Sequence, residues 1–407
     1  MPRKPGTAKE QIRIRMYRVG FGDCFLITLP AREGPHHVLV DCGVHARGNI
    51  DTIGRAVDDI SQVTDQKVDI IIATHAHQDH ISGFGSFASK FSALKVREIW
   101  MPWTENPDDP DAAKLKKKQL ALIENLSQHF AARRGAQFDA VRAALMNLAS
   151  NQAAFDLLRS GLHRATVRYH EAGAELKDPA GIEGLVVKVL GPPRDRDFLA
   201  QMDPPAGQRY LRLAEGKLKE GNVLKPFPVE TRAPRDGSGP RLDQKDIKAL
   251  REMVASPMEG LAFALDQAIN NTSLATLFQY SGQNLLFPGD AQYGNWRYWL
   301  DKDGSDRVLS QISFYKVSHH GSVNATPKNA LEKMTTGKFA VMLSTQSKPW
   351  PSSPEAKLME ALERKANRRV VRSESLPVAG APSVAMTRLP LGYARGDLWY
   401  DCFIPLG

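Results

Sequence analysis

Short apolar runs and segments with helical spacing alternate along the chain. The apolar runs, which are typical of buried strands, cover residues 24–29, 36–43, 68–75, 96–101, 185–193, 273–280, 283–290, 312–322, 339–345 and 368–374. The run "VDIIIATH" is continuous and rich in β-branched residues, which is the pattern of a strand covered on both faces. The segment "IRIRMY", at residues 12–17, alternates apolar and basic positions and predicts an exposed or edge strand.

Segments with apolar residues three and four apart lie between these runs and predict helices. The predicted helices cover residues 81–91, 112–134, 138–162, 293–300, 326–334 and 353–366. Because strand, loop and helix follow one another, we predict a layered α/β fold. We interpret residues 1–407 as a single domain with two insertions. The first, at residues 105–168, is helical, and the second, at residues 194–260, is polar, rich in Gly and Pro, and partly mobile.

The composition excludes several classes of protein. The chain has 407 residues, 42% of them hydrophobic, and can bury a large core. No run reaches the roughly eighteen apolar residues that a membrane helix needs, and the basic start has no apolar stretch behind it, as a secretory signal would. Three cysteines are too few for a disulfide framework. We therefore expect a soluble protein of the reducing cytoplasm, with no membrane partner.

The net charge of +9 favours a polyanionic partner, because basic side chains that meet phosphates release counterions. Basic side chains gather in both insertions, where they either follow a nucleic-acid backbone or form a solvated surface. They are Lys114, Lys116, Lys117, Lys118, Arg133 and Arg134 in the first insertion and Arg209, Arg212, Lys217, Lys219 and Lys225 in the second. Four tryptophans either stack on bases or pack in the core, namely Trp103, Trp296, Trp299 and Trp350.

Four polar side chains crowd the end of the buried run at residues 68–75. They are His75, His77, Asp79 and His80, in the stretch "THAHQDH". Buried polar groups of this kind are costly unless they are paired or coordinate a metal, and imidazole with carboxylate suits Zn²⁺, Mn²⁺ or Fe. On an irregular loop, these residues can serve two ions about 3.5–4 Å apart, which is a site for hydrolysis or phosphoryl transfer. The alternative is a surface loop that is rich in histidine by chance.

The stretch "THAHQDH" resembles the signature motif of the metallo-β-lactamase superfamily. Three further motifs in family order extend the resemblance from about Arg13 to Glu374. They are "VLVDCG" with Asp41, "LLFPGDA" with Asp290, and "KVSHHGS" with His319 and His320. The resemblance implies a four-layer αββα sandwich and a metal-dependent hydrolase, with the two insertions outside the family's pattern.

A narrower likeness concerns the metallohydrolase domain of bacterial DNA-uptake (competence) proteins. The segments "VGFGDCFLI", "NNTSLATL", "GDA" and "KVSHHGS" are similar to that subgroup, and bacterial phosphorylcholine esterases share similar motifs. This likeness implies a phosphodiester or phosphate-ester substrate, so the leading hypothesis is a phosphodiesterase or nuclease. A hydrolase of small esters, lactones or phosphate esters is the alternative. A diiron redox protein and a non-catalytic binding module are further ones, because one fold hosts many functions.

The resemblance implies six ligands for two divalent ions, with Zn²⁺ as the first expectation and Mn²⁺ or Fe as alternatives. The ligands are His75 and His77 for the first ion, Asp79, His80 and His320 for the second, and Asp290 as the bridge. A bridging hydroxide then attacks the substrate, and Asp79 aligns it. His319 faces the substrate as a phosphate donor or general acid, with the reversed order of the two histidines left open. Asp41 orients ligands rather than binding metal.

One departure from the family pattern concerns the first ion. Many members supply a further histidine from the segment that matches "INNTSLATL", where this chain has Asn270 and Asn271. The first ion is then completed by Asn271, Asp266 or water, or is weakly held. Two histidines of the helical insertion, His163 and His170, are further candidates, although a structural role is the simpler interpretation. Cys24 is expected to be a buried strand residue and no nucleophile.

Overall fold

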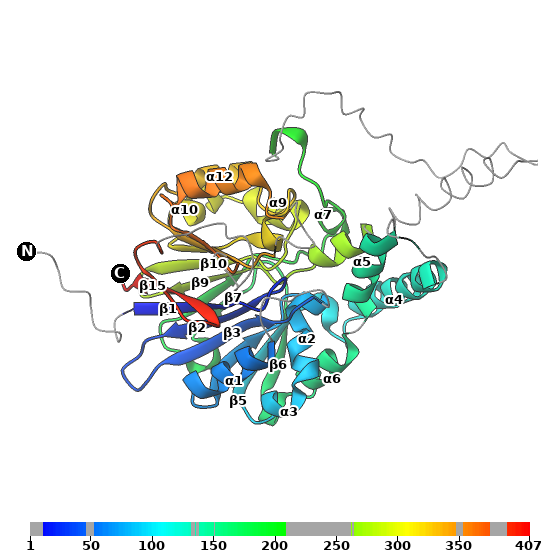
Figure 1. Ribbon diagram of the computed structural model, residues 1–407, viewed down its shortest axis with the longest axis horizontal. Coiled ribbons are helices and arrows are strands. Elements are labelled where there is room, and N and C mark those ends of the chain that lie inside the picture. The colour runs from blue at the N-terminus through cyan, green and yellow to red at the C-terminus, as the bar shows by residue number, and fades with distance from the viewer. Residues whose placement is uncertain are drawn as a thin grey trace, which may run out of the picture.

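The protein is described here by a computed structural model that covers residues 11–45, 53–131, 135, 138–149, 151–208, 262, 264–346, 353–374 and 389–407. Two sheets pack face to face, and helices cover the outer face of each sheet (Figure 1). The predicted four-layer αββα sandwich is therefore confirmed. Within these residues, no helix is both long and apolar enough to cross a lipid bilayer.

Within the described residues, the first sheet has eight strands in the order β14-β15-β1-β2-β3-β4-β5-β6. The strands from β3 to β6 run parallel, whereas β14, β15, β1 and β2 pair antiparallel with their neighbours. The bounds are β1 Gln11–Tyr17, β2 Cys24–Leu29, β3 His36–Cys42, β4 Lys67–Ile72, β5 Lys95–Pro102, β6 Thr166–His170, β14 Tyr393–Arg395 and β15 Trp399–Pro405.

The second sheet has seven strands in the described residues, in the order β13-β12-β11-β10-β9-β8-β7. Its strands from β10 to β13 are parallel, and those from β7 to β10 are antiparallel. The bounds are β7 Glu175–Lys177, β8 Val186–Val189, β9 Thr276–Tyr280, β10 Gln283–Phe287, β11 Phe314–Lys316, β12 Ala340–Leu343 and β13 Val370–Arg372.

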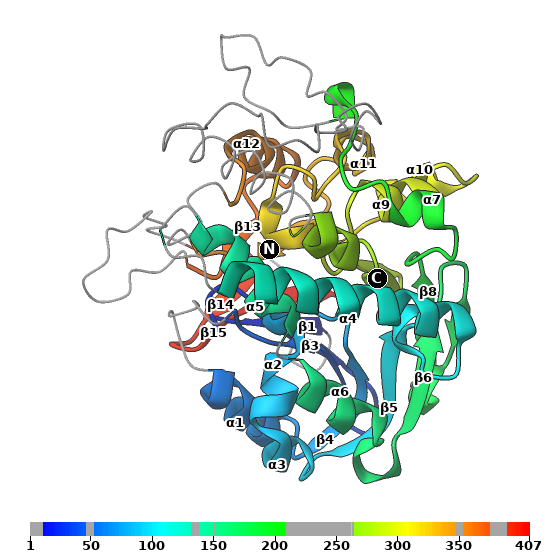
Figure 2. The same cartoon turned by 90° about the vertical axis from the view of Figure 1, so that its right-hand side faces the viewer.

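Helices α1, α2, α3 and α6 cover the first sheet, and α9 to α12 cover the second (Figure 1). Figure 2 shows α4 running across the side of the molecule that also carries α2, α5 and α6. The bounds are α1 Ile53–Val63, α2 Gln78–Ser86, α3 Ala88–Phe91, α4 Pro110–Ala131, α5 Asp139–Ala149, α6 Gln152–Arg159, α7 Arg196–Leu199, α9 Tyr293–Leu300, α10 Ser305–Ser310, α11 Lys328–Lys333 and α12 Ala356–Lys365. Residues 264–270 are helical as well.

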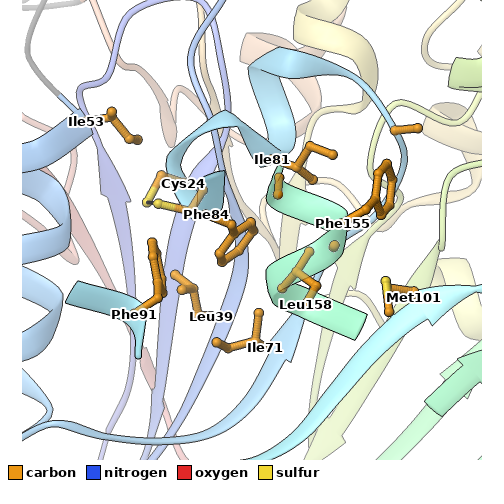
Figure 3. Packing of buried hydrophobic residues seen from close by; sticks show 14 of the residues in the cluster. Cys24, Leu39, Ile53, Ile71, Ile81, Phe84, Phe91, Met101, Phe155 and Leu158 are labelled. Carbon is orange, nitrogen blue, oxygen red and sulfur yellow. Dashed lines mark hydrogen bonds between the residues drawn. The ribbon is translucent and has the colours of Figure 1, made fainter. Parts of the chain in front are cut away.

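Three hydrophobic clusters hold the four layers together, because successive strand residues point to opposite faces. Ile71 of β4 faces the outer helices and packs with Phe84 of α2 and Leu158 of α6 (Figure 3). Its neighbour Ile70 faces the space between the sheets, where Phe278 of β9 also lies. A third cluster packs β10, β11 and β12 against α9 to α12. A strand between two packed layers must be apolar on both faces, which explains the continuous apolar run of β4.

The prediction of an exposed or edge strand at residues 12–17 is wrong. Strand β1 lies inside the first sheet, paired with β15 on one side and β2 on the other. Arg15 is 4% exposed because Asp401 of β15 and Asp59 of α1 neutralise it, each at 2.7 Å. Buried ion pairs let basic residues alternate in an interior strand. Strands β6, β7, β14 and β15 were not predicted from the sequence.

The predicted helical insertion contains α4, α5 and α6, but α6 packs on the first sheet and β6 already begins at Thr166. Helix α5 lies against the His/Asp motif, where the side chain of Asn147 accepts a hydrogen bond from the backbone N–H of Asp79 at 3.3 Å. Asn151 donates to the backbone carbonyl of Ala76. Most of the predicted polar insertion, residues 209–260, lies outside the described residues.

Candidate metal centre

The His/Asp motif spans the end of β4 and the start of α2. His75 and His77 lie on the connecting loop, whereas Asp79 and His80 belong to the first turn of the helix rather than to an irregular loop. Helix α2 approaches the end of β3 so closely that a Cβ atom on Gly43 would lie 2.4 Å from the backbone nitrogen of His80. Glycine at this position thus allows the helix to present Asp79 and His80 to the centre.

Asp290 and His320 reach the same place from the second sheet. Asp290 follows the end of β10, and His320 follows β11 in a short turn at Ser318–Gly321. Both histidines of that turn have left-handed backbone angles, with φ of 42° for His319 and 50° for His320. Such angles are rare outside glycine and concentrate at functional sites, where the surrounding structure enforces them.

Four predicted ligands converge on one point. The ligand atoms of Asp79, His80, Asp290 and His320 all lie within 4.8 Å of one another, and the four side chains are buried. Nε2 of His320 lies 3.2 Å from Oδ2 of Asp79, and Nε2 of His80 lies 3.1 Å from Oδ2 of Asp290. Two imidazoles and two carboxylates at this spacing form a candidate site for a divalent cation.

The two remaining predicted ligands form a pair beside this cluster. Nε2 of His75 lies 3.0 Å from Nδ1 of His77, so the two ring nitrogens face a common point. On the other side of the His77 ring, Nε2 lies 3.4 Å from Oδ1 of Asp266. Asp266 thus lies beside the ring of His77, although the two side chains form no hydrogen bond.

Asp41 contacts both Thr74 and His80 through its carboxylate. Its carboxylate accepts hydrogen bonds from the backbone N–H and the hydroxyl of Thr74, both at 2.7 Å. The same carboxylate lies 2.7 Å from Nδ1 of His80. It therefore fixes the ring of His80 with Nε2 toward the cluster.

The two asparagines in place of the family's histidine have different environments. The amide oxygen of Asn271 accepts from the backbone N–H groups of Gln292 and Asn295, and its NH₂ group donates to backbone carbonyls between residues 198 and 201. These bonds commit its amide to the backbone and disfavour Asn271 as a ligand. Asn270 instead faces the site, where its Nδ2 lies 3.3 Å from Nε2 of His319. Within the described residues, Oδ1 of Asn270 is buried without a hydrogen-bond partner.

The electrostatics separate the histidines into two kinds. Burial lowers the pKa of His77 to about 4 and that of His75 well below its usual value, so both rings are neutral and can donate lone pairs. Burial also opposes the charge on His80 and His320, but neighbouring carboxylates, with Asp290 the foremost, outweigh it and raise both pKa values. Both rings therefore favour the protonated form more than a free imidazole does.

Carboxylates respond in the opposite sense. Burial alone would raise the pKa of Asp79 and Asp290, but the charge of His80 outweighs it and holds both pKa values well below the usual range. For Asp266, burial together with the charges of Asp79 and Asp290 raises the pKa to about 8. The ligand carboxylates are therefore ionised and ready for a cation.

Two other candidates, His170 and Cys24, have structural roles. His170 packs edge-on against Trp100 at 5.0 Å between ring centroids, and burial lowers its pKa to about 4. Cys24 is buried 3.7 Å from the sulfur of Cys42, and burial raises the pKa of its thiol well above normal, which makes a poor nucleophile. Three of the four tryptophans are buried, and Trp350 lies outside the described residues, as do Arg133, Arg134 and the basic residues of the second insertion. His163 lies in a short turn at Leu162–Arg164.

Comparison with known proteins agrees with this geometry. Residues 17–141 match the family model described as the metallo-β-lactamase superfamily. The matched stretch includes Asp41 and the motif from His75 to His80 and ends before Asp290, so the meeting of Asp290 and His320 with this motif is an observation of the structure alone. The narrower likeness to DNA-uptake proteins stays a prediction.

Among solved structures, the chain is similar to the metallo-β-lactamase fold protein YhfI from Bacillus subtilis. The two are 9% identical with a TM-score of 0.35, over 88% of this chain and 96% of that chain. A likeness this distant carries no information about substrate. A search of curated proteins gives no match.

Two residues beside the predicted ligands were not predicted from the sequence. Asp23 and Lys316 are 1% and 3% exposed, and their charged groups contact each other directly behind His80, Asp290 and His320. The available signal was Lys316 itself, because a lysine inside the apolar run "ISFYKV" is costly unless it meets a buried carboxylate.

Proposed function

We propose that the protein is a phosphodiesterase that holds two divalent metal ions and cleaves nucleic acid. The observation that carries the proposal is the convergence of Asp79, His80, Asp290 and His320, from both sheets, on one buried point. The metallo-β-lactamase match over residues 17–141 supports the hydrolase class. Phosphoester specificity is the part that experiment must decide.

The charges of the centre favour two ions. Among the described residues, Asp23, Asp41, Asp79 and Asp290 are buried close together, and Lys316 offsets one of their four charges. Unbalanced buried charge is costly. With one divalent ion, the centre keeps a net negative charge. With two ions, the positive charge of the ions exceeds the remaining negative charge of the carboxylates by one. The hydroxide that such ions would supply carries one negative charge and would balance this excess.

The residues divide into two ligand groups. His75 and His77 would hold one ion, Asp79, His80 and His320 the other, and Asp290 would lie between them. When bound, such ions supply an acidified water and neutralise charge that develops on the substrate. Oδ1 of Asp79 is buried without a hydrogen-bond partner in the described residues, so it is free to accept a hydrogen bond from the attacking group and align it.

His319 is suited to contact the substrate, since it is only partly buried while the ligands around it are fully buried. Its Nδ1 lies 2.7 Å from the hydroxyl of Ser322 and 3.3 Å from Oδ1 of Asn324, which hold the ring in place. Its Nε2 is then directed toward Asn270 and the site. An imidazole held this way can bind a phosphate oxygen or serve the leaving group.

Helix α4 offers part of a basic surface for a nucleic-acid backbone. Lys114, Lys117 and Lys118 are exposed on it, whereas Lys116 is held by Glu105 at 2.9 Å. Helix α4 packs on α5, and α5 contacts the motif through Asn147. The three exposed lysines thus lie on the first helix of the pair α4 and α5 (Figure 2), and Asn147 of α5 connects this pair to the motif. Binding through several phosphates makes affinity fall steeply with salt.

The decisive experiment is metal analysis of the purified protein together with a substrate panel. The panel holds single- and double-stranded DNA, RNA, bis-p-nitrophenyl phosphate and a lactone. We expect two ions per chain and cleavage of a nucleic acid and the phosphodiester. We expect Asp79→Ala to abolish both, while Asp303→Ala, at an exposed aspartate between α9 and α10, retains them.

Two outcomes would overturn the proposal. Equal turnover by wild type and Asp79→Ala would show that the chemistry lies elsewhere. Turnover of the lactone alone, insensitive to salt, would move the protein to the small-molecule hydrolases.

A further inference from the structure

We propose that Lys316 is a positioning residue that fixes the Asp290 carboxylate at the metal centre, and that Asp23 holds Lys316 in place. The inference rests on the proposed function because it concerns how the same centre orients its bridging ligand. It adds two residues that do not themselves offer a ligand to the ions.

Lys316 points from the end of β11 into the interior behind the centre. Its ammonium contacts the carboxylate of Asp23, lies 3.3 Å from Oδ1 of Asp290, and donates to the backbone carbonyl of Gly289 at 3.1 Å. Lys316 is 3% exposed, so an ammonium group with three donors has found three acceptors in the interior. A side chain bound on three sides has little freedom to move.

The two oxygens of Asp290 have different partners as a result. Oδ1 faces Lys316 and also accepts a hydrogen bond from the backbone N–H of His319 at 3.1 Å. Oδ2 faces Nε2 of His80 at 3.1 Å and Nε2 of His320 at 3.5 Å. One oxygen is therefore held by the protein, and the other is left for cations. In the proposed centre, Asp290 would bind through Oδ2 alone.

Asp23 supplies the balancing charge. Its carboxylate lies 3.7 Å from Nδ1 of His80 and 4.0 Å from Nδ1 of His320, on the side of both rings that faces away from the cluster. The backbone fixes the position of Asp23, because its N–H donates to the carbonyl of Asp79 at 2.9 Å. Asp23, Asp41 and His80 also form a second group of ligand-type atoms, and the Lys316 ammonium provides positive charge beside it.

Loss of the ammonium would leave the backbone N–H of His319 as the remaining partner of Oδ1 of Asp290. A carboxylate held less firmly at this oxygen can turn to bind a cation through both oxygens, which raises the coordination number and adds electron density to the ion. A more highly coordinated ion is a weaker Lewis acid and leaves less room for substrate. Lys316 would thus keep the centre open.

The test compares Lys316→Met, which keeps the length of the side chain, with wild type after loading with Co²⁺. The visible bands of Co²⁺ weaken as its coordination number rises. We expect Lys316→Met to retain bound cobalt but to show weaker bands, and to lose activity by about 10- to 100-fold, the range typical of residues that orient metal ligands.

Two variants separate positioning from a structural role. Lys365→Met is the matched control, because Lys365 is also buried, at 8% exposed. Its ammonium, on α12, donates to the backbone carbonyl of Glu332 on α11, away from the centre. It should leave the spectrum unchanged. The double variant Asp23→Asn/Lys316→Met removes the unpaired carboxylate, so it should recover thermal stability without recovering the bands.

The inference fails if Lys316→Met has the wild-type cobalt spectrum, or if the double variant restores the spectrum along with stability. Failure of the proposed function looks different, since wild type would then bind no cobalt at the centre or cleave no phosphodiester.

Discussion

Replacing Asp41 with asparagine should weaken metal binding without disturbing the backbone. Asp41 has a left-handed backbone with φ of 56°, a conformation that asparagine tolerates as well as aspartate. Asparagine also has the same size, so the packing of this buried position is retained. The substitution therefore changes one property of the site, namely which groups can donate and accept hydrogen bonds.

The altered pattern reverses the orientation of the proton on His80. In wild type, Asp41 accepts from the backbone N–H of Thr74, from the hydroxyl of Thr74, and from Nδ1 of His80, each at 2.7 Å. If the amide oxygen of the introduced asparagine keeps the bond to the Thr74 N–H, the NH₂ group of that side chain must face His80. Nδ1 of His80 then has to accept, so the ring proton moves to Nε2, the nitrogen that faces Asp290 and the cation.

The expected cost follows from what partners of metal-binding histidines usually contribute. Losing such a partner weakens metal affinity by about 10- to 100-fold, which corresponds to roughly 1.4–2.8 kcal/mol. The effect should fall on the ion held by Asp79, His80 and His320, and spare the ion at His75 and His77. At a free metal concentration that just saturates wild type, the variant should hold about one ion fewer per chain.

Competition with a chromophoric chelator measures both affinities, and metal analysis after gel filtration gives the stoichiometry. Asp59→Asn is the matched control, since Asp59 also accepts charged and neutral hydrogen bonds, from Arg15 and Tyr17, away from the centre. If Asp41→Asn binds both ions as tightly as wild type, the tautomer of His80 does not control the site and the reasoning is refuted.

Three further predictions concern neighbouring residues. His170→Phe should make the free energy of unfolding less sensitive to acid. Because the pKa of His170 is lowered to about 4 in the folded protein, its contribution to stability is complete above pH 6.5 and declines by up to about 3 kcal/mol toward pH 4. Melting of the chelator-treated variant should therefore depend less on pH in that window than melting of wild type. Gly43→Ala should lower the free energy of unfolding by about 3 kcal/mol and reduce metal binding, because the added Cβ meets the backbone of His80 at 2.4 Å. Gly207→Ala, where nothing lies within 4 Å of the added Cβ, should change neither property, and melting together with metal analysis measures both. Asn271→Ala should cost about 3 kcal/mol in denaturant unfolding yet keep the wild-type metal stoichiometry, and a lost ion would instead make Asn271 a ligand.

The layered fold and the candidate ligand types could be predicted from local patterns in the sequence. The apolar run that ends in "THAHQDH" had to be a strand covered on both faces, and side chains this polar at its end had to be paired or bound to cations. The helices at residues 293–300, 326–334 and 353–366 were predicted close to their observed places because their apolar residues recur with helical spacing. Local periodicity carries this information, so it could be read without the fold.

The contacts between side chains from distant parts of the chain could be identified only in the folded structure. Arg15 looked exposed until Asp401, from the far end of the chain, was found beside it. Likewise, nothing near Asp23 in the sequence indicates Lys316, and nothing distinguishes Asn270, which faces His319, from Asn271, which is bound to backbone groups. Such contacts join residues far apart in the chain, and their geometry depends on how the two sheets pack. Periodicity indicates which face of a helix or strand is buried. The partner of a buried charge, in contrast, depends on which segments the fold brings together.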